Sequence, residues 1–189
     1  MATARKLTDD GFPTGVTVDE FLAWCKGRPG RFELHNGAVV AMAPERIGHV
    51  RIKSRVQQAL QSAIKRAGLE CEALADGIAV HVSEMRWYQP DALVYCGATA
   101  SADEVKIENP SIVVEVLSPS TTHIDEGAKL IGYFSMPSVQ HYLIIDPDGL
   151  PLVHHQRQSD DTILARIVGT GTLKLDPPGI EIDVADLFI

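Results

Sequence analysis

One acidic residue inside an apolar run limits the folds that this sequence can adopt. The run from Ile112 to Leu117 is short, rich in β-branched side chains and followed by a Ser-Pro pair. This pattern is typical of a strand buried on both faces in a parallel or mixed sheet. Glu115 lies in its middle, where desolvating an isolated carboxylate is offset only by a partner, a metal or protonation. The run therefore predicts an α/β fold with a polar site on a central strand.

A second carboxylate stands at the start of another predicted strand. Asp91 follows Pro90 and precedes the apolar run from Ala92 to Tyr95. Two acids on adjacent strands near one sheet edge repel each other unless a cation lies between them, and a hard divalent ion such as Mg²⁺ takes oxygen ligands. A Pro-Asp pair is nevertheless often a simple turn, a strand glutamate often marks an edge, and buried acids mark functional sites only in some cases. Pattern alone leaves both interpretations open.

The length of 189 residues and a hydrophobic content of 45% suit one domain, 1–189, with a sizeable core. Residues Met1 to Gly15 read as a loose polar lead-in. No stretch approaches the roughly 20 apolar residues of a membrane span, and no signal-peptide pattern opens the chain, so we expect a cytoplasmic protein without membrane contact. The three cysteines are odd in number and lack metal-finger spacing, which predicts reduced thiols.

The net charge of −8 counts against broad, non-specific nucleic-acid binding, which depends on neutralising phosphates. The charges are unevenly distributed, however. From Arg46 to Leu69 the chain has no acidic residue and six basic ones. A local basic surface is therefore compatible with the acidic total.

The acid-free segment belongs to a predicted long helix from Glu45 to Ala67, closed by Gly68. Apolar residues recur in it at helical spacing and predict one buried stripe. A polar stripe beside it carries Arg51, Arg55 and Lys65, which could face solvent or contact phosphates.

His49 falls on the arc of the apolar stripe and is expected to point inward. Most inward histidines are core residues with satisfied hydrogen bonds, although a helix N-terminus also suits an anion.

Shorter elements surround this helix. Thr17 is expected to cap a first helix that Gly27 ends, and Asn36-Gly37 between apolar runs predicts a β-hairpin. Asp76-Gly77 predicts a second hairpin within residues 70–82. Glu33 alternates with its apolar neighbours, so its side chain leaves the opposite face of its strand, where a solvated carboxylate is the simpler interpretation.

Past Ser118, Thr121 or Thr122 is expected to start a helix through a capping box. Asp125, Lys129 and Tyr133 follow at successive i+4 steps and share one face of it. The simpler alternative for Asp125 and Lys129 is a surface ion pair. The remainder of the chain predicts further strands, an antiparallel extension that could supply a dimer surface.

Together, these residues resemble the bacterial Uma-two family of predicted restriction endonucleases, within the PD-(D/E)XK nuclease superfamily. The resemblance covers nearly the whole chain. The motifs that carry it, in this order, are Arg31-Phe32-Glu33-Leu34, His49, Pro90-Asp91, the segment from Glu115 to Thr121, then Asp125, Lys129 and Tyr133, and the segment from Gln140 to Pro147. It implies a restriction-endonuclease-like mixed sheet flanked by helices, a divalent metal (Mg²⁺ or Mn²⁺) and hydrolysis of DNA phosphodiester bonds.

The resemblance also implies roles for particular residues. Asp91 and Glu115 match the two metal-binding acids, and the carbonyl of Val116 would be a further ligand. The superfamily places a lysine two residues after the second acid, but position 117 here is Leu. Lys129 resembles the displaced lysine of many family members, which would help orient or deprotonate the attacking water. His49 and Glu33 would line the same site.

Two functions remain open at this point. One is a metal-dependent endodeoxyribonuclease, which contacts DNA through the Arg51, Arg55 and Lys65 face. The other is a non-catalytic DNA-binding or protein-interaction module that kept the nuclease-like fold, which the acidic charge and Leu117 would suit. The sequence specifies neither the DNA sequence recognised, nor the cleavage polarity, nor the oligomeric state.

Overall fold

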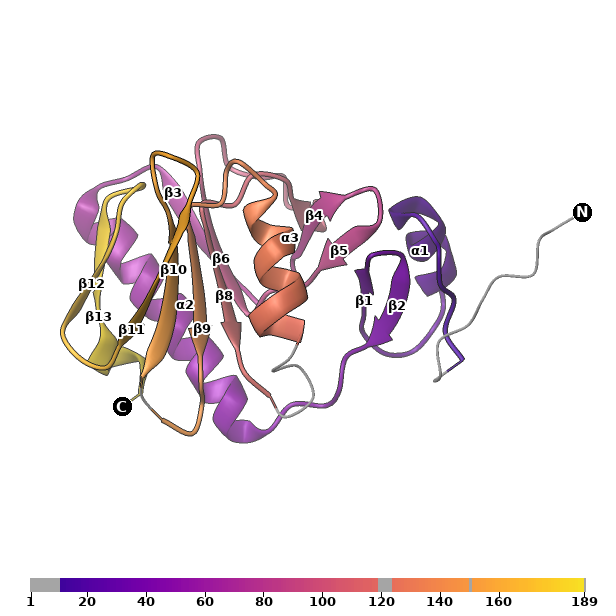
Figure 1. Cartoon of the computed structure of the whole chain (residues 1–189), viewed down its shortest axis with the longest axis horizontal. Helices are drawn as coiled ribbons and strands as arrows, with labels where there is room; N and C mark the ends of the chain where they lie inside the picture. The colour runs from indigo at the N-terminus through magenta and orange to yellow at the C-terminus, as the bar shows by residue number, and fades with distance from the viewer. Residues whose placement is uncertain (1–10, 119–123, 150, 189) are drawn as a thin grey trace, which may run out of the picture.

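The computed structural model describes residues 11–118, 124–149 and 151–188 of the chain. Its largest element is a six-stranded mixed sheet (Figure 1). In spatial order the strands are β11 (Ile163–Val168), β10 (Leu152–Arg157), β9 (His141–Ile145), β8 (Ile112–Val116), β6 (Ala92–Cys96) and β3 (Cys71–Ala75). The β8–β9 pair is parallel and the other four pairs are antiparallel. This is the mixed α/β architecture that the sequence predicts.

A second, five-stranded sheet lies beside the first and holds the N-terminal elements (Figure 1). Its spatial order is β2 (Ala38–Ala41), β1 (Phe32–His35), β5 (Arg86–Tyr88), β4 (Ala79–Ser83) and β7 (Lys106–Ile107). Helix α1 (Val18–Cys25) precedes it, with the predicted capping box between Thr17 and Glu20. The predicted Asn36-Gly37 hairpin joins β1 to β2, and both turn residues have positive φ, 48° and 81°.

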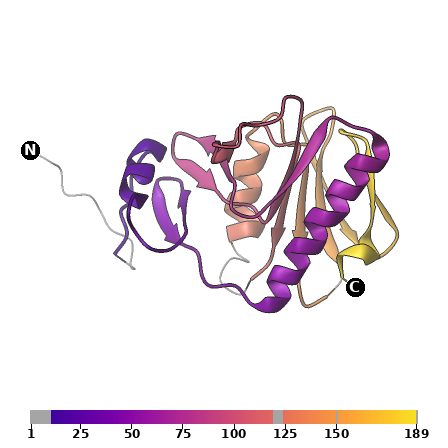
Figure 2. The same cartoon turned by 180° about the vertical axis from the view of Figure 1, so that it is seen from behind.

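Two helices cover opposite faces of the six-stranded sheet. Helix α2 (Ile47–Ala67) crosses one face diagonally (Figure 2), and its apolar stripe packs on alternate strand residues such as Val114 and Val116. Helix α3 (Leu130–Phe134), which continues a π-helical turn over Ile124–Lys129, lies on the other face with Val113. Since successive strand side chains alternate between faces, Glu115 shares the α3 face with Val113.

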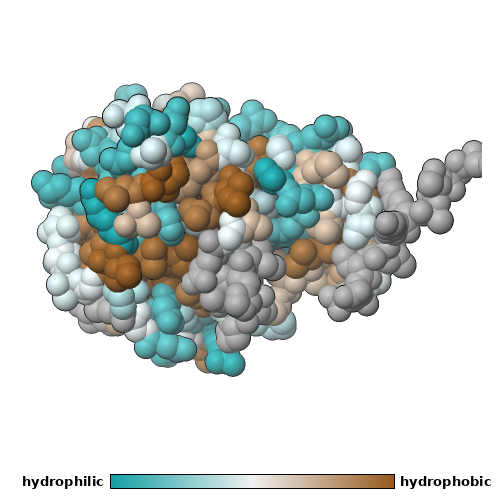
Figure 3. Space-filling model, in the orientation of Figure 1, coloured by the Kyte–Doolittle hydropathy of each residue, from teal (hydrophilic) through white to brown (hydrophobic). Residues whose placement is uncertain are grey.

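The C-terminal part forms the predicted antiparallel extension. Strands β10 and β11 extend the large sheet beyond β9, and β12 (Thr172–Leu175) and β13 (Ile180–Asp183) form a separate hairpin that packs on α2. A 3₁₀ turn, Val184–Leu187, closes the described chain. Hydrophobic residues gather on the exposed face over β11 and α3 (Figure 3), where Ile167 and Ile131 are 76% and 68% exposed. A dimer through the β-rich C-terminal third stays a prediction.

Several expectations about local structure are corrected. Strands β3 and β4, on either side of Asp76-Gly77, do not pair with each other: β3 pairs with β6 in one sheet, and β4 with β5 and β7 in the other. The Asp-Gly turn therefore connects two sheets. The long helix, expected from about Glu45, begins at Ile47.

The lead-in is also more ordered than expected where it is described. Phe12 packs edge-to-face on Trp24 and Phe32, and the carbonyl of Pro13 accepts a hydrogen bond from the amide of Val39. The helix start predicted at Thr121 or Thr122 lies outside the described residues.

The prediction of three reduced cysteines is wrong for two of them. Cys71 and Cys96 are directly opposite each other in the antiparallel β3–β6 pair, and a disulfide joins them. They are 25 residues apart in sequence, so only the strand register brings them together. Cys25 is free. In the described ranges, no helix has both the length and the apolar character needed to cross a membrane.

Candidate active site

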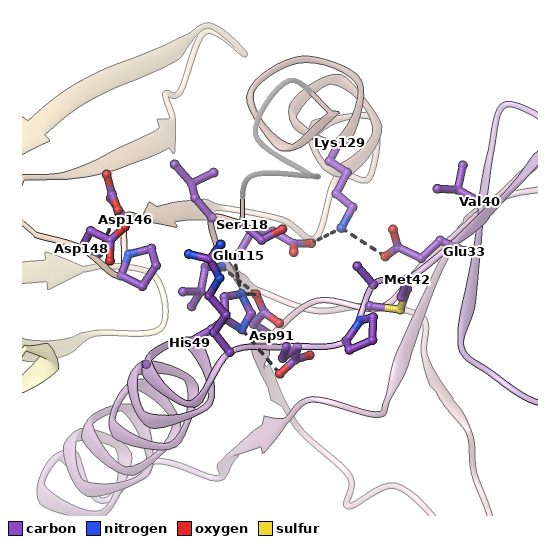
Figure 4. Close-up of a pocket in the computed structure, with 18 of the residues that line it drawn as sticks. Glu33, Val40, Met42, His49, Asp91, Glu115, Ser118, Lys129, Asp146 and Asp148 are labelled. Carbon is purple, nitrogen blue, oxygen red and sulfur yellow. Dashed lines mark hydrogen bonds and ion pairs between the residues drawn. The ribbon is translucent and has the colours of Figure 1, made fainter.

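A cavity of about 830 Å³ opens between the two sheets at the end of strands β8 and β9. Its lining includes the acids and bases that the sequence singles out (Figure 4). Those residues are Glu33, His49, Asp91, Glu115 and Lys129, and Val116, whose carbonyl is a predicted ligand, lines the cavity with them. The turn after β9 and the segment between β2 and α2 complete the wall. The structure thus brings the predicted residues around one cavity, while the catalytic roles predicted for them stay predictions.

Glu115 reaches the cavity because of its position in β8. It lies on the α3 face and is 3% exposed. Its Oε1 accepts hydrogen bonds from Lys129 Nζ at 3.0 Å and from the Tyr133 hydroxyl at 2.8 Å. Burial, and next the negative charge of Glu115, raise the pKa of Tyr133 well above its usual value. The phenol therefore keeps its proton and donates a hydrogen bond to Glu115. One lysine and one tyrosine, a helical turn apart, therefore hold this carboxylate.

Asp91 lies immediately before β6, the neighbour of β8. Its backbone amide donates to the carbonyl of Val114 at 3.0 Å, and its Oδ2 accepts from the amide of Val116 at 2.7 Å. The antiparallel register pairs Ala92 with Val114, so Asp91 stands opposite the end of β8 that carries Glu115. The two acids come from adjacent strands at one sheet edge, as the sequence predicts.

Lys129 connects Glu115 with a third acid. Its Nζ lies 3.0 Å from Glu115 Oε1 and 3.1 Å from Glu33 Oε1, between the two carboxylates (Figure 4). Glu33 also accepts from the amide of Gln89 at 2.6 Å and lies 2.8 Å from His35 Nε2. Burial would raise the pKa of Glu33, but Lys129 and His35 outweigh it and lower that pKa to about 2. Glu33 is consequently a buried anion, and the simpler interpretation of a solvated carboxylate does not hold.

The alternative of a surface ion pair for Lys129 fails on burial, because the residue is 2% exposed. Asp125, its expected partner, has no described side chain. Leu117, at the position of the superfamily lysine, packs against the apolar cluster on the α3 face of the sheet. The amine near Glu115 is therefore supplied by the following helix.

His49 points inward from the first turn of α2. Its Nε2 lies 2.7 Å from the carbonyl oxygen of Val116 and 3.8 Å from Asp91 Oδ2. A carbonyl only accepts, so Nε2 carries the hydrogen, and in a neutral ring Nδ1 then presents a lone pair. Among the described atoms, this buried Nδ1 has no hydrogen-bond partner and lies 3.5 Å from Glu45 Oε2. A buried nitrogen lone pair beside the Glu45 carboxylate is an available ligand for a cation.

Sequence reasoning missed a second buried lysine behind Asp91. Lys53 is 5% exposed, and its Nζ lies within ion-pair distance of Glu45, Asp76 and Asp91. Arg31 pairs with Asp76 from the other side and lies 3.6 Å from Glu45. Helical phase could have predicted this position, because Lys53 follows His49 by four residues and so lies on the same inward-facing side of the helix.

The cavity offers donors that suit a divalent cation. The predicted set of Asp91, Glu115 and the Val116 carbonyl consists of oxygen atoms, which Mg²⁺ and Mn²⁺ prefer. A second set, Glu45, His49 and Asp91, has ligand atoms within 4.8 Å of one another. Asp91 belongs to both sets, and His49 belongs to the second. The residues present therefore fit a divalent metal.

The basic stripe of α2 lies outside the cavity. Arg51 and Lys65 are exposed and Arg55 is partly buried, and none of the three lines the cavity, whereas Arg46 does. At roughly 1.5 Å per residue, Lys65 lies about 24 Å further along the helix than His49.

Comparisons with known proteins agree with this picture. The model of the Uma2 family, described as "Putative restriction endonuclease", matches residues 18–185. Two Synechocystis proteins, slr1290 and sll1609, are 26% and 24% identical to this chain. The first match covers 92% of this chain and 91% of slr1290, and the second covers 82% and 88% of sll1609.

A solved structure from Anabaena variabilis, titled as a putative nuclease belonging to DUF820, superposes with a TM-score of 0.73 at 17% identity. The superposition covers 92% of this chain and 97% of that one, so the two share a fold. With the family model matching residues 18–185, this chain belongs to the Uma2 family of nuclease-like proteins.

Proposed function

We propose that the protein is a metal-dependent endonuclease that hydrolyses phosphodiester bonds in DNA. The observation that carries this proposal is the convergence of Asp91, Glu115 and Glu33 with Lys129 in one cavity. Buried charged groups are costly, and a fold without a use for them would be as stable with apolar residues in their place. Membership in a family whose description is "Putative restriction endonuclease" supports the same reaction class.

Asp91 and Glu115 would hold the metal ion, with the carbonyl of Val116 as a further ligand. A bound Mg²⁺ or Mn²⁺ supplies a polarised water and offsets negative charge on the phosphate. Hydrogen bonds already fix both carboxylates: the Val116 amide holds Asp91, and Tyr133 holds Glu115. Such pre-organised ligands need no rearrangement when the reaction begins.

Lys129 would act on the reacting water and phosphate. Its ammonium lies at the cavity wall, 3.0 Å from Glu115, where it can orient the water and stabilise charge that develops on the phosphate. Glu33, on its other side, holds the ammonium in place. Lys129, held by Glu33, would thus take the role of the superfamily lysine, whose position is occupied here by Leu117.

DNA would approach along the start of α2. Arg46 lines the cavity and Arg51 is exposed one turn later, so both can contact phosphates beside the scissile one. Arg55 and Lys65 would extend this surface. A cytoplasmic location and a single domain stay predictions.

The proposal is tested by nicking of supercoiled plasmid by the purified protein with Mg²⁺ or Mn²⁺. Cleavage is expected with either ion and should stop with EDTA. Asp91→Asn should abolish cleavage, whereas Lys106→Met, which removes an exposed lysine paired with Glu108, should cleave as wild type does. A wild-type protein that binds DNA but leaves the plasmid intact with both ions would instead support the non-catalytic module.

A further inference from the structure

We infer that Lys53 is the internal counter-cation of the site: its ammonium fills a cation position next to Asp91 that a divalent ion would otherwise occupy. The inference rests on the proposed function, because it concerns how the same acids bind metal.

The contacts of Lys53 resemble those of a bound ion. Its Nζ lies 2.7 Å from Glu45 Oε1, 2.7 Å from Asp76 Oδ2 and 2.8 Å from Asp91 Oδ1. The three acids come from separate elements: the segment before α2, the turn between β3 and β4, and the residue before β6. An ammonium has three hydrogens, so each acid can receive one of them.

The charge balance around Lys53 shows why a cation is needed there. Glu45, Asp76 and Asp91 contribute three carboxylates, and the lysine and arginine that pair with them among the described residues are Lys53 and Arg31. Removing Lys53 would leave three acids against one guanidinium, which itself is bonded to Asp76. Uncompensated acids at this spacing attract a cation strongly.

The position of Lys53 distinguishes it from Lys129. Glu45, Asp91 and Lys129 line the cavity, but Lys53 and Asp76 do not. Lys53 therefore holds Asp91 from behind and need not move when a metal ion enters from the cavity. It acts as a positioning residue: it fixes Asp91 Oδ1 and reserves the space behind that carboxylate, whereas Lys129 faces the substrate.

The test is Mn²⁺ binding, measured by calorimetry and by loss of the free-ion electron paramagnetic resonance signal. In Lys53→Met the apolar stem is kept and the space of the ammonium is vacated. This variant should bind one more Mn²⁺ per chain than wild type, or bind Mn²⁺ at least about tenfold more tightly. Lys53→Arg, which keeps the charge, should gain no ion, and Lys106→Met should match wild type.

A double variant covers the case in which Lys53→Met fails to fold. Lys53→Met with Asp76→Asn removes one charge of each sign, and it should bind as many Mn²⁺ ions as wild type. If Lys53→Met is folded and binds Mn²⁺ with wild-type number and affinity, or more weakly, the inference is wrong. It is also wrong if the double variant gains an ion.

Failure of the proposed function looks different. In that case wild type itself binds no Mn²⁺ in the cavity and leaves plasmid uncut, whatever Lys53→Met does.

Discussion

Two groups of buried polar side chains, one at the cavity and one on strands β9 and β10, are built in opposite ways. At the cavity, the acids Glu33, Asp91 and Glu115 are each held by a lysine. On β9 and β10, His141 Nδ1 lies 2.9 Å from His154 Nε2, and His141 Nε2 lies 3.0 Å from the carbonyl of Pro177. The first group lines the cavity described above, and neither histidine is part of that lining.

The histidines form a neutral chain of hydrogen bonds. His141 Nε2 donates to the carbonyl of Pro177, so His141 Nδ1 accepts the hydrogen of His154 Nε2. Burial lowers the pKa of both histidines to about 4. Burial alone therefore favours the neutral form of a side chain. The cavity differs because its carboxylates stay ionised and each is paired with a lysine ammonium. Charged groups that face a cavity are a better marker of a functional site than buried polar groups in general.

The largest effect is expected at Lys129. Lys129→Ala should lower plasmid cleavage by roughly 100- to 1000-fold, because the loss of a positioned cation is felt most where charge develops on the phosphate. Lys129→Arg should recover little activity, since a planar guanidinium does not replace a compact ammonium. Mn²⁺ affinity and circular dichroism should show that both variants fold and bind metal. Cleavage by the Ala variant at the wild-type rate would remove Lys129 from the mechanism.

The histidine pair should affect stability and leave chemistry unchanged. The folded pKa of about 4 lies below the usual 6.5, so the unfolded chain binds more protons between these pH values. Stability should therefore fall as the pH drops from 6.5 towards 4, by on the order of 1 kcal/mol per pH unit for each histidine.

Glu33 allows the two regions to be compared by titration. Its lowered pKa contributes stability that is present above pH 4.5 and is lost as the pH falls towards 2. We expect the free energy of unfolding in urea to fall as the pH is lowered. The contribution of the histidines should be lost first, and the contribution of Glu33 at lower pH. His154→Gln should weaken the dependence between pH 6.5 and 4, and Glu33→Gln the dependence below 4.5. An unchanged profile in either variant would contradict the assignment for that residue.

The smallest effect concerns the basic stripe of α2. Arg51→Ala should weaken DNA binding a few-fold and reduce the slope of log K against log salt by about 1, as expected for one lost phosphate contact. Lys65→Ala, at the far end of the helix, should change less. Fluorescence anisotropy with EDTA present separates binding from cleavage. Equal losses in both variants would indicate diffuse attraction instead of a DNA path along the start of α2.

Local patterns predict much of this fold and part of the candidate site. Strand alternation places Glu115 on the α3 face, and i+4 spacing places Lys129 and Tyr133 opposite it. These are short-range periodicities, which the sequence carries directly. Helical phase predicts that His49 points inward, and it also predicts this for Lys53, which follows four residues later.

What the sequence did not predict depends on long-range pairing. An Asp-Gly pair marks a turn, but it does not specify the strands with which the two flanking strands pair. The strands on either side of Asp76-Gly77 therefore belong to two different sheets and do not form the expected hairpin. Asp76 is then placed by Arg31 and Lys53, its partners 45 and 23 residues away. The Cys71–Cys96 disulfide was missed for the same reason, because strand register creates it.

The most direct measurement of the central claim is a crystal grown with MnCl₂ and examined for anomalous scattering. We expect a Mn²⁺ peak in the cavity, in contact with the carboxylates of Asp91 and Glu115, and no such peak in crystals of Glu115→Gln. A peak held by Glu45, His49 and Asp91 alone would move the metal to the second donor set. The absence of any peak at Asp91, at Mn²⁺ concentrations that support cleavage, would contradict the account.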